Sequence, residues 1–129
     1  MGTNFYFHTK EKEYRDRWFD FGEYELTDFP EFGYLIHIAK TSGGWCPLFQ
    51  AHKNVSSVSD MKRVYESGGF SIVDEYGETY DWEAFQKRVV EFGDGWDEVY
   101  SHLEYEDGRY AHLYCKDADG YEFTWRDFS

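Results

Sequence analysis

Two apolar runs separated by a polar turn lie near the middle of the chain and predict the hairpin around which the fold is organised. Residues 34–40 (YLIHIAK) are mostly apolar and include β-branched and aromatic members, which favour strands. Residues 41–44 (TSGG) are typical of a reversing turn, because glycine adopts positive φ without steric cost. Residues 45–50 (WCPLFQ) form the second apolar run. The pattern predicts two antiparallel strands joined by this turn.

A first strand and a less regular segment precede this hairpin. Residues 2–9 (GTNFYFHT) are rich in aromatic residues and threonine, which predicts a strand. Residues 10–33 begin with alternating charges and continue with aromatic residues that Gly22, Pro30 and Gly33 interrupt. We interpret this segment as a hairpin extension or an ordered loop rather than a long helix.

Two later segments have the apolar spacing of amphipathic helices. In residues 54–66, Ser56 or Ser57 is the expected N-cap, and the apolar face consists of Val58, Met61, Val64 and Tyr65. A second helix over residues 82–92 starts after Thr79 or Asp81, and its apolar face consists of Trp82, Phe85, Val89 and Phe92. Glycines at 68–69 and at 93 are the expected ends of the two helices.

A short strand and a closing hairpin complete the pattern. Residues 70–74 (FSIVD) predict a strand, and the turn at 75–78 places Gly77 where unusual backbone angles are needed. Residues 109–115 and 121–125 predict two strands around a turn at 116–120. The order of elements predicts an α+β fold with a mainly antiparallel sheet, built from hairpins, and two helices packed on it.

Length and composition add the size of the domain and the character of its surface. A chain of 129 residues is typical of one domain, so we expect residues 1–129 to form a single α+β unit. The aromatic share of 22% exceeds what such a core needs, which indicates aromatic rings at or near the surface. The alternative is a bulky core built from few aliphatic residues.

The charge is acidic and unevenly distributed. The formal net charge is -13, and residues 65–129 hold seventeen acids and five bases, against nine and eight in residues 1–64. Phosphates would be repelled by such a surface, so we expect no direct binding of nucleic acid. A host or phage protein with a basic surface is the expected partner, and a charge that only prevents aggregation is the alternative.

The cysteines and the hydropathy indicate the compartment. Cys46 and Cys115 are too few for a disulfide scaffold and have no CxxC spacing. The sequence shows no signal peptide and no apolar run that approaches the length of a membrane span. We therefore expect a cytoplasmic protein with reduced thiols and no contact with a membrane.

Three blocks of sequence resemble a family of small, mostly uncharacterised proteins of tailed bacteriophages and prophages. The blocks are MGTNFYF, IHIAKTSGGWCPLFQ and IVDEYGETYDWEAFQKRV, and together they cover roughly a third of the chain in the family's order. The pattern His-x-x-Lys-[Ser/Thr]-Ser-x-Gly-Trp falls here on His37, Lys40, Thr41, Ser42, Gly44 and Trp45. Many relatives carry a Cys-x-x-Cys pair before this hairpin that suggests zinc, but residues 10–33 here contain no cysteine. The resemblance implies a phage accessory protein in the host cytoplasm and brings no established activity.

An acid-rich stretch over residues 91–107 is the first candidate site. We expect an acidic and aromatic binding surface formed by Glu91, Asp94, Trp96, Asp97, Glu98, Tyr100, Glu104, Tyr105, Glu106 and Asp107. The carboxylates repel one another unless a cationic partner offsets them, and the rings supply apolar anchors. Such a surface suits an inhibitor that occupies the basic site of a host enzyme, as DNA-mimicking phage proteins do. The alternative is a solvated loop with incidental aromatic residues.

The hairpin supplies a second candidate site, made of His37, Lys40, Ser42 and Cys46. A lysine beside a Ser-Gly-Gly turn is compatible with anion binding, although the P-loop spacing is missing. His37 and Cys46, on paired strands, are a candidate nucleophile pair. The alternative is that His37 packs on a strand face, Lys40 is solvated and the turn has no ligand.

The evidence in the sequence for metal ligands is weaker than the evidence for the two candidate sites above. Cys46 and His52 are one candidate pair. His112 and Cys115 are the second, but their spacing places the two side chains on opposite faces of a strand. Residues 117–120 (DADG) are similar to the start of a calcium loop, but the acid expected at its end is missing, so we interpret them as a turn. We expect no bound metal and no cofactor.

Three functions follow from these observations. The first is a non-enzymatic phage accessory protein that binds a host or phage protein through its acidic, aromatic surface, in its concrete form an inhibitor of a nucleic-acid-directed host defence. The second is a small enzyme or an anion- or ligand-binding module centred on residues 37–45. The third is a virion-associated structural protein.

Overall fold

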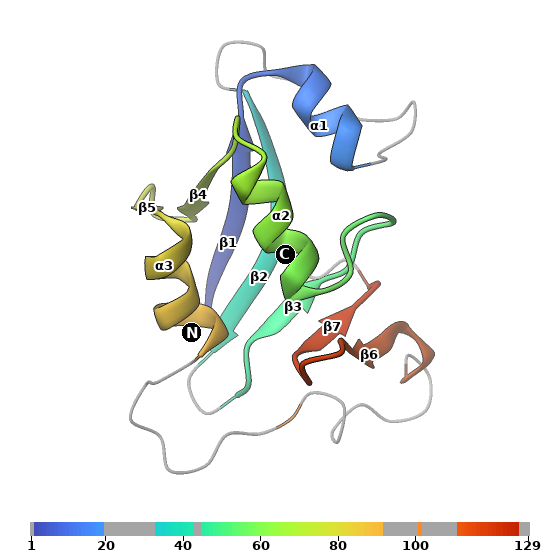
Figure 1. Ribbon diagram of the computed structural model, residues 1–129. Coiled ribbons are helices and arrows are strands. Elements are labelled where there is room, and N and C mark those ends of the chain that lie inside the picture. The colour runs from blue at the N-terminus through green and yellow to red at the C-terminus, as the bar shows by residue number, and fades with distance from the viewer. Residues whose placement is uncertain (1, 20–32, 43–44, 92–100, 102–110, 127–129) are drawn as a thin grey trace.

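The protein forms one seven-stranded sheet with helices packed on it, which confirms the predicted α+β class. This computed structural model describes residues 2–19, 33–42, 45–91, 101 and 111–126 (Figure 1). The strand order is β5-β4-β1-β2-β3-β7-β6. The two longest strands, β1 (Gly2–Thr9) and β2 (Tyr34–Ser42), therefore lie near the centre of the sheet and pair in antiparallel fashion.

The remaining strands are short and extend the sheet on both sides. β4 (Ser71–Asp74) pairs with β1, and β5 (Thr79–Tyr80) adds one edge. On the other side, β3 (Leu48–Gln50) pairs with β2 in antiparallel fashion. β7 (Glu122–Thr124) then pairs with β3 in parallel, and β6 (Tyr114–Lys116) forms the second edge. The sheet is thus mainly antiparallel, as predicted, and the β3–β7 pair is the parallel exception among the pairs described.

Both predicted helices are present. α2 (Val58–Glu66) starts at Ser57, whose hydroxyl accepts a hydrogen bond from the Asp60 amide at 3.0 Å. α3 (Trp82–Phe85) starts at Asp81, whose carboxylate accepts from the Ala84 amide at 2.8 Å. A π-helix over Gln86–Val90 continues α3, so the helical segment ends at Val90, directly before Glu91. The predicted end at Gly93 lies outside the described residues.

The interpretation of residues 10–33 was wrong for its first part. Residues of this segment form α1 (Lys12–Trp18), a third helix, while residues 20–32 lie outside the described part of the chain. Tertiary contacts stabilise this short, highly charged helix. The Arg15 guanidinium lies 4.5 Å from the centre of the Tyr34 ring, and the Tyr14 ring packs against Phe70. Such contacts connect residues far apart in the sequence, so the local charge pattern did not predict them.

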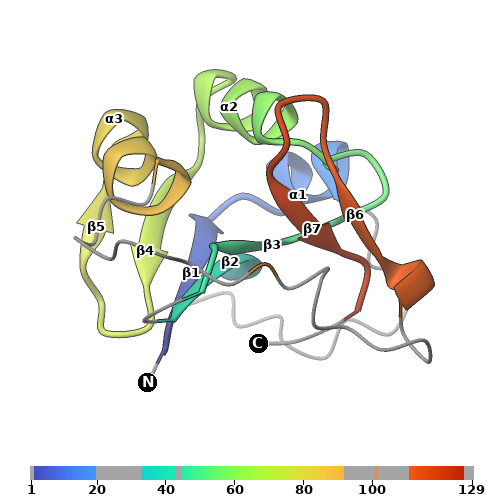
Figure 2. The same ribbon diagram turned by 90° about the horizontal axis from the view of Figure 1, so that it is seen from below.

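The helices cover one face of the sheet. Figure 2 shows α2 and α3 on the same side of the strands, and the contact of Tyr14 with Phe70 holds α1 there as well. Between the layers is a core rich in aromatic rings, in which Phe5, Phe7, Phe49, Phe85 and Phe123 are fully buried. The bulky aromatic core that was the alternative interpretation of the composition is therefore present, although some rings are exposed as well.

Two of the three predicted turns with glycine have the expected backbone, and the glycines of the third, at positions 43 and 44, lie outside the described residues. Gly77 has φ 88° and Gly120 has φ 89°, values that side-chain-bearing residues rarely adopt. The closing hairpin is shorter than predicted, because residues Ala111–Leu113 form a 3-10 turn and the strands are limited to β6 and β7. In the turn between β6 and β7, the Asp117 carboxylate accepts hydrogen bonds from the Asp119 and Tyr121 amides. Its other oxygen accepts from the Val58 amide at the start of α2, which joins hairpin and helix.

Candidate functional site

The face of the sheet opposite the helices carries a network of polar side chains centred on His37. The His37 Nε2 atom lies 2.9 Å from the Asn4 side-chain oxygen, and its Nδ1 atom lies 3.4 Å from the Gln50 side-chain oxygen. The Tyr6 ring packs against the imidazole in an edge arrangement, with centroids 5.4 Å apart. The network therefore joins three neighbouring strands, β1, β2 and β3.

The partners of the two amides determine which of their atoms face His37. The Gln50 amide nitrogen donates to the carbonyl oxygens of Thr124 and Arg126, so its oxygen must face the imidazole. The Asn4 amide nitrogen faces the Glu75 carboxylate at 3.4 Å, and its oxygen therefore faces Nε2. Both ring nitrogens of His37 thus face acceptors, an arrangement that only the doubly protonated imidazolium satisfies completely.

A β-bulge brings His37 and Lys40 to the same face of the sheet. Residues three apart on a regular strand point to opposite faces. In β2, however, the register with β1 changes between the pairs Phe5↔Ala39 and Tyr6↔His37, so that Ile38 is an extra residue. The hydroxyl-bearing Ser42 lies on this face too, because Ser42 and Lys40 are two residues apart. Three of the four residues predicted at the hairpin are thereby in one row.

The row does not converge on one point. Lys40 and Ser42 lie against the backbone of Gly2, where an added Cβ atom would be 2.7 Å from Lys40 Cε and 2.8 Å from Ser42 Oγ. His37 lies further along the strand, opposite Tyr6. His52 supports the backbone here, since its Nε2 atom donates to the His37 carbonyl oxygen at 2.8 Å. The arrangement is a polar stripe on the face opposite the helices, and the glycine at position 2 makes room for it. This face is exposed at Leu35 on β2, whereas Leu48 on β3 and Thr124 on β7 are buried; the part over β4, β1 and β2 is hereafter the open sheet face.

The predicted His37–Cys46 nucleophile pair is wrong. The β2–β3 register pairs Lys40 with Leu48, and the Trp45 amide donates to the Ser42 carbonyl oxygen at 3.1 Å, so Cys46 lies near the Ser42 end of β2. His37 is five residues further along β2, roughly 15 Å away at about 3.3 Å per residue. The antiparallel pairing of the two strands was predicted correctly, but its register separates the side chains of His37 and Cys46.

Cys115 and His112, the second candidate pair of metal ligands, lie in consecutive elements near the end of the chain. Cys115 lies in β6 beside the core, and His112 lies in the preceding 3-10 turn. Burial raises the pKa of the Cys115 thiol, and the nearby Asp117 carboxylate raises it further. Among the described residues, no group of three or more His, Cys, Asp or Glu side chains could hold a metal ion.

Asp74, at the end of β4, organises the turn between β4 and β5. Its Oδ1 atom accepts hydrogen bonds from the amides of Tyr76 and Glu78, at 2.8 and 3.0 Å, and its Oδ2 atom accepts from the Tyr80 hydroxyl at 2.8 Å. Burial alone would raise the pKa of Asp74, but these hydrogen bonds outweigh it and the pKa is lowered. Burial and the bond to Asp74 raise the pKa of Tyr80. The carboxylate is thus a structural anion that fixes the conformation of residues 75–78, hereafter the acidic turn.

Beside the acidic turn, the open sheet face has a hollow of about 560 Å³. Its lining includes the outward-facing residues of three adjacent strands, namely Tyr6, His8, Leu35, Ser71 and Val73, together with Glu75 from the turn. Leu35 is 57% exposed, and Tyr76, in the acidic turn, is 70% exposed. Burial and the Glu75 carboxylate raise the pKa of Tyr6. The hollow therefore combines apolar surface with carboxylates at its rim.

Most of the acidic and aromatic surface predicted for residues 91–107 lies outside the described residues: Asp94, Trp96, Asp97, Glu98, Tyr100, Glu104, Tyr105, Glu106 and Asp107. Glu91 is described, and it is an exposed residue directly after the π-helix. Its Oε1 atom accepts a hydrogen bond from the Gln86 side chain at 3.1 Å. The predicted surface as a whole stays a prediction.

Comparison of the chain with protein-family models, with curated proteins and with solved structures found no match. The resemblance to tailed-phage proteins therefore stays a prediction. No helix in the described part of the chain has the length and apolar character needed to cross a membrane.

The partners that give His37 and Asp74 their environments were not predicted from the sequence. Asn4 and Gln50 are separated from His37 by 33 and 13 residues, and no local pattern connects them. Gln50 had one visible signal, since it is a polar residue within the apolar run of residues 45–50. A polar side chain at such a position needs a hydrogen-bond partner, which here is supplied by β7 and the residues after it.

Proposed function

We propose that this protein is a small, non-enzymatic accessory protein that binds a partner protein with a basic surface. The observation that carries the proposal is the acidic turn beside the hollow on the open sheet face. Here the exposed acids Glu75 and Glu78 flank the exposed Tyr76, and Leu35 lines the adjacent hollow, a composition that supplies both charge attraction and apolar anchoring.

The charge of the chain supports this proposal. Residues 65–129 hold seventeen acids and five bases, and the acidic turn belongs to this half. A net charge of -13 raises the rate at which a basic partner is encountered and makes the complex sensitive to salt. The same charge disfavours nucleic acid as the direct ligand.

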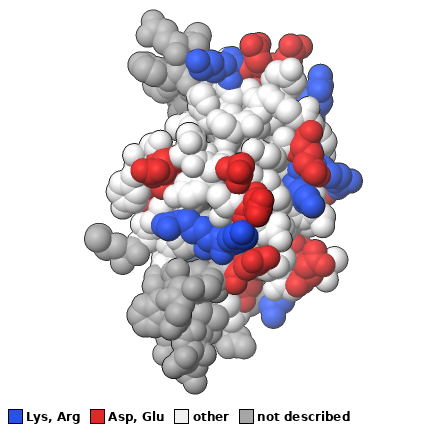
Figure 3. Space-filling view, turned by 60° about the vertical axis from the view of Figure 1, so that its left-hand side comes forward, with Lys and Arg blue, Asp and Glu red and all other residues white. Residues whose placement is uncertain are grey.

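The acidic excess is not uniform over the surface, so only some of the acidic residues are proposed to bind the partner. Figure 3 brings forward the side that carries β5 and α3, and acidic and basic side chains are interspersed there. On α3 and the π-helix, Lys87 forms an ion pair with Glu83 at 3.2 Å, and the Arg88 guanidinium lies 6.0 Å from the centre of the Phe5 ring. The acidic turn and the hollow are therefore the proposed binding surface of the described residues, with residues 91–107 as its extension.

In its concrete form, the proposal is a phage protein that acts in the host cytoplasm and inhibits a nucleic-acid-directed host defence. The support for this form is the resemblance of three sequence blocks to tailed-phage proteins, combined with the acidic and aromatic composition. An acidic surface that occupies a basic nucleic-acid site would block that site by charge and shape.

The test is affinity capture from host lysate at low and high salt, with mass spectrometry of the retained proteins. The variant that addresses the described residues is Tyr76→Ala with Glu78→Gln, because the side chains of both residues are exposed and only their backbone amides hold Asp74. A second variant neutralises Asp94, Asp97, Glu98, Glu104, Glu106 and Asp107. We expect one basic partner, lost at high salt and from both variants.

The control variant is Glu11→Gln with Glu13→Gln, which removes two exposed acids from residues 1–64, where nine acids are nearly balanced by eight bases. It should retain the partner as the wild type does. If all variants retain the same proteins equally, the acidic residues only keep the protein in solution and the proposal is wrong. Retention of a nucleic-acid-processing enzyme would favour the inhibitor form, and retention of another basic protein would contradict that form alone.

A ligand-binding module centred on the hairpin is the second candidate. The observation that favours it is the bulge at Ile38, which places His37 and Lys40 on one face of the sheet. Two groups that can carry positive charge in one row would suit an anion. An anion that co-purifies with the protein and is lost from a Lys40→Met variant would support this candidate.

A further inference from the structure

Two rows of side chains on the open sheet face shape the hollow beside the acidic turn. Cross-strand pairing aligns Leu35, His8 and Ser71 in one row, and Tyr6, Val73 and Thr79 in the next. The large side chains lie on β1 and β2, and the small ones on β4 and β5. The face is therefore lower over β4 and β5, and both rows line the resulting hollow of about 560 Å³.

The hollow presents apolar surface to solvent. Leu35 is 57% exposed, and Tyr6 and Val73 are half-buried. Covering such surface with the methylene groups of another molecule is favourable, because it removes apolar area from water.

A single carboxylate, that of Glu75, supplies the available charge. Its Oε1 atom accepts a hydrogen bond from the Asn4 backbone amide at 2.8 Å, and the Glu75 amide donates to the Asn4 carbonyl oxygen at 3.0 Å. Both the backbone and the side chain of Glu75 are thus fixed to β1. The carboxylate is close enough to Tyr6 to raise the pKa of that hydroxyl, together with burial. Among the residues that the structure describes, the Glu75 Oε2 atom has no hydrogen-bond or ion-pair partner.

The other titratable groups of the lining do not compete with a cation for Glu75. The Asp74 carboxylate is occupied by two amides of the acidic turn and by the Tyr80 hydroxyl. The His8 imidazole points toward Gly33, where an added Cβ atom would lie 2.9 Å from Nε2. No lysine or arginine lines the hollow.

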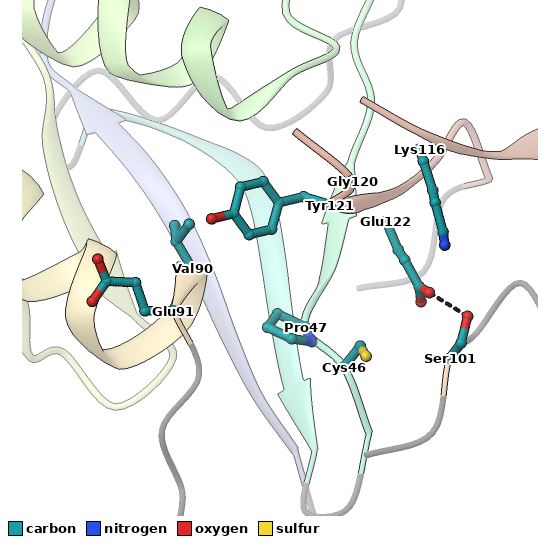
Figure 4. A pocket seen from close by; sticks show the side chains of 9 residues that line it. All are labelled: Cys46, Pro47, Val90, Glu91, Ser101, Lys116, Gly120, Tyr121 and Glu122. Atoms are coloured by element: carbon teal, nitrogen blue, oxygen red, sulfur yellow. Dashed lines mark hydrogen bonds between the residues drawn. The ribbon is translucent and has the colours of Figure 1, made fainter. Parts of the chain in front are cut away.

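Another cavity, of about 350 Å³ between the π-helix and the closing hairpin, offers no such carboxylate (Figure 4). In Figure 4 the Glu91 carboxylate points away from the other lining side chains, and its Oε1 atom accepts a hydrogen bond from Gln86. Glu122, on the opposite side, is 5% exposed and accepts a hydrogen bond from the Ser101 hydroxyl. Apolar surface and an available carboxylate therefore come together in the hollow and not in this cavity.

From this arrangement we infer that the hollow receives an arginine side chain of the basic partner, an inference that rests on the proposed function and specifies the anchoring residue. The methylene groups would lie against Leu35 and Val73, and the guanidinium would donate to Glu75 Oε2. A guanidinium carries several N–H donors in a planar fork and stacks on aromatic rings, so it suits a site that also offers the Tyr6 ring and the hydroxyls of Ser71 and Thr79. Arginine is also enriched among the residues that carry interface energy.

The test is a titration of the 15N-labelled protein with the blocked tripeptide acetyl-Ala-Arg-Ala-amide at physiological ionic strength, followed by amide chemical shifts. Saturable shifts are expected at Tyr6, Leu35, Val73 and Glu75. The first comparison peptide carries citrulline, which has nearly the shape of arginine but no charge, and it should bind about tenfold more weakly. The second carries lysine, which has the charge without the planar fork, and it should bind less tightly than the arginine peptide.

The variant Glu75→Gln removes the charge and keeps an oxygen that can accept from the Asn4 amide, so the fold is expected to persist. It should weaken the arginine peptide about tenfold. The matched control is Glu66→Gln, which removes an exposed acid of α2, on the side of the sheet that the helices cover, and should leave the affinity unchanged (Figure 2).

A second variant, Ser71→Tyr, tests the shape of the hollow without a change of charge. Aromatic residues favour strands, so β4 should persist, while the added ring would fill the space between Val73 and His8. The variant should lose the saturable shifts.

Four outcomes would overturn the inference. These are equal affinity for the arginine and citrulline peptides, equal weakening by Glu75→Gln and Glu66→Gln, unchanged binding by Ser71→Tyr, and the absence of saturable shifts at the hollow. A lysine peptide that binds as tightly as the arginine peptide would overturn the choice of arginine.

The result is distinguishable from that of affinity capture. A basic partner that is captured and then lost from the acidic variants, without any binding of the arginine peptide, would contradict this inference alone. Binding of the peptide in the hollow, without any captured partner, would contradict the proposed function alone.

Discussion

The two faces of the sheet are built from the same strands but differ in the contacts that stabilise them. In β1, Phe5 and Phe7 point to the helix-covered face and are fully buried, whereas Asn4 and Tyr6 point to the open face. The covered face is stabilised by apolar burial and ring packing. The open face is held by directional contacts, those of His37 and of Glu75, and it leaves Leu35 exposed.

The difference between the faces separates stability from recognition. Burial of apolar side chains is non-directional, so the covered face needs only the right sizes and spacing. On the open face, each polar group needs a particular partner, and surface that is not used internally stays available for another molecule. Substitutions on the two faces should therefore have different effects, and adjacent residues of one strand allow a direct comparison.

The largest effect is expected from Ile36→Ala on the covered face. Ile36 is 1% exposed and belongs to the core, so its truncation should lower the free energy of unfolding by about 2–5 kcal/mol. The neighbouring Leu35, on the open face, is the matched control, and Leu35→Ala should change the same quantity by less than about 0.5 kcal/mol. Urea unfolding measures both. Equal losses for the two variants would mean that the open face is covered in solution.

An intermediate effect is expected from Asp74→Asn at the edge of the sheet. The substitution removes the charge that accepts hydrogen bonds from the acidic turn and from Tyr80, so the loss should be about 1–3 kcal/mol at neutral pH. Because the folded-state pKa of Asp74 is lowered, its contribution is complete above the unfolded pKa of about 3.9 and is lost as the pH falls through the folded value. The difference between wild type and variant should thus shrink in acid.

The control for this pH dependence is Asp119→Asn, which changes an exposed aspartate in the turn of the closing hairpin. It should alter the free energy of unfolding by less than about 0.5 kcal/mol at neutral pH. Unfolding curves between acid and neutral pH distinguish the two variants. A difference for Asp74→Asn that persists unchanged in acid would contradict the role of its charge.

A smaller effect, about 1–2 kcal/mol, is expected from His37→Leu on the open face, because Asn4 and Gln50 would each lose a donor. The exposed His112 provides the control, and His112→Leu should leave the unfolding free energy nearly unchanged. Nitrogen NMR of the wild-type ring sharpens the comparison, since it identifies which nitrogens of His37 donate to Asn4 and Gln50. A neutral ring with one bare nitrogen would show that the amide partners face it differently.

The elements and their ends followed from local pattern. The strand at residues 2–9, the cap at Ser57, the cap at Asp81 and the glycine of the acidic turn were predicted and are present. These features depend on neighbouring residues, because side-chain caps and positive φ involve contacts within one turn of the chain. The short helix α1 was missed because its stability comes from contacts with β2 and with Phe70 rather than from its own sequence.

The candidate sites were predicted less well than the elements. His37, Lys40 and Ser42 do share a face, but a bulge that only the pairing with β1 reveals is what places them there. Cys46 was grouped with them, and the structure places it instead beside Glu122 and Tyr121. These three residues come together because β3 and β7 are parallel, a pairing between segments more than seventy residues apart.

The sequence by itself determined two of the three described helices, α2 and α3, most strands, the turns at Gly77 and Gly120 and the acidic character of this protein. Local propensity, spacing and charge are properties of neighbouring residues, and they survive in any fold that the chain adopts. Only the tertiary structure decided the order of the strands, the environment of His37 and the composition of the cavity between Glu91 and Glu122. The physical reason is that these features depend on pairing between distant segments, where register and packing, rather than local preference, select the neighbours.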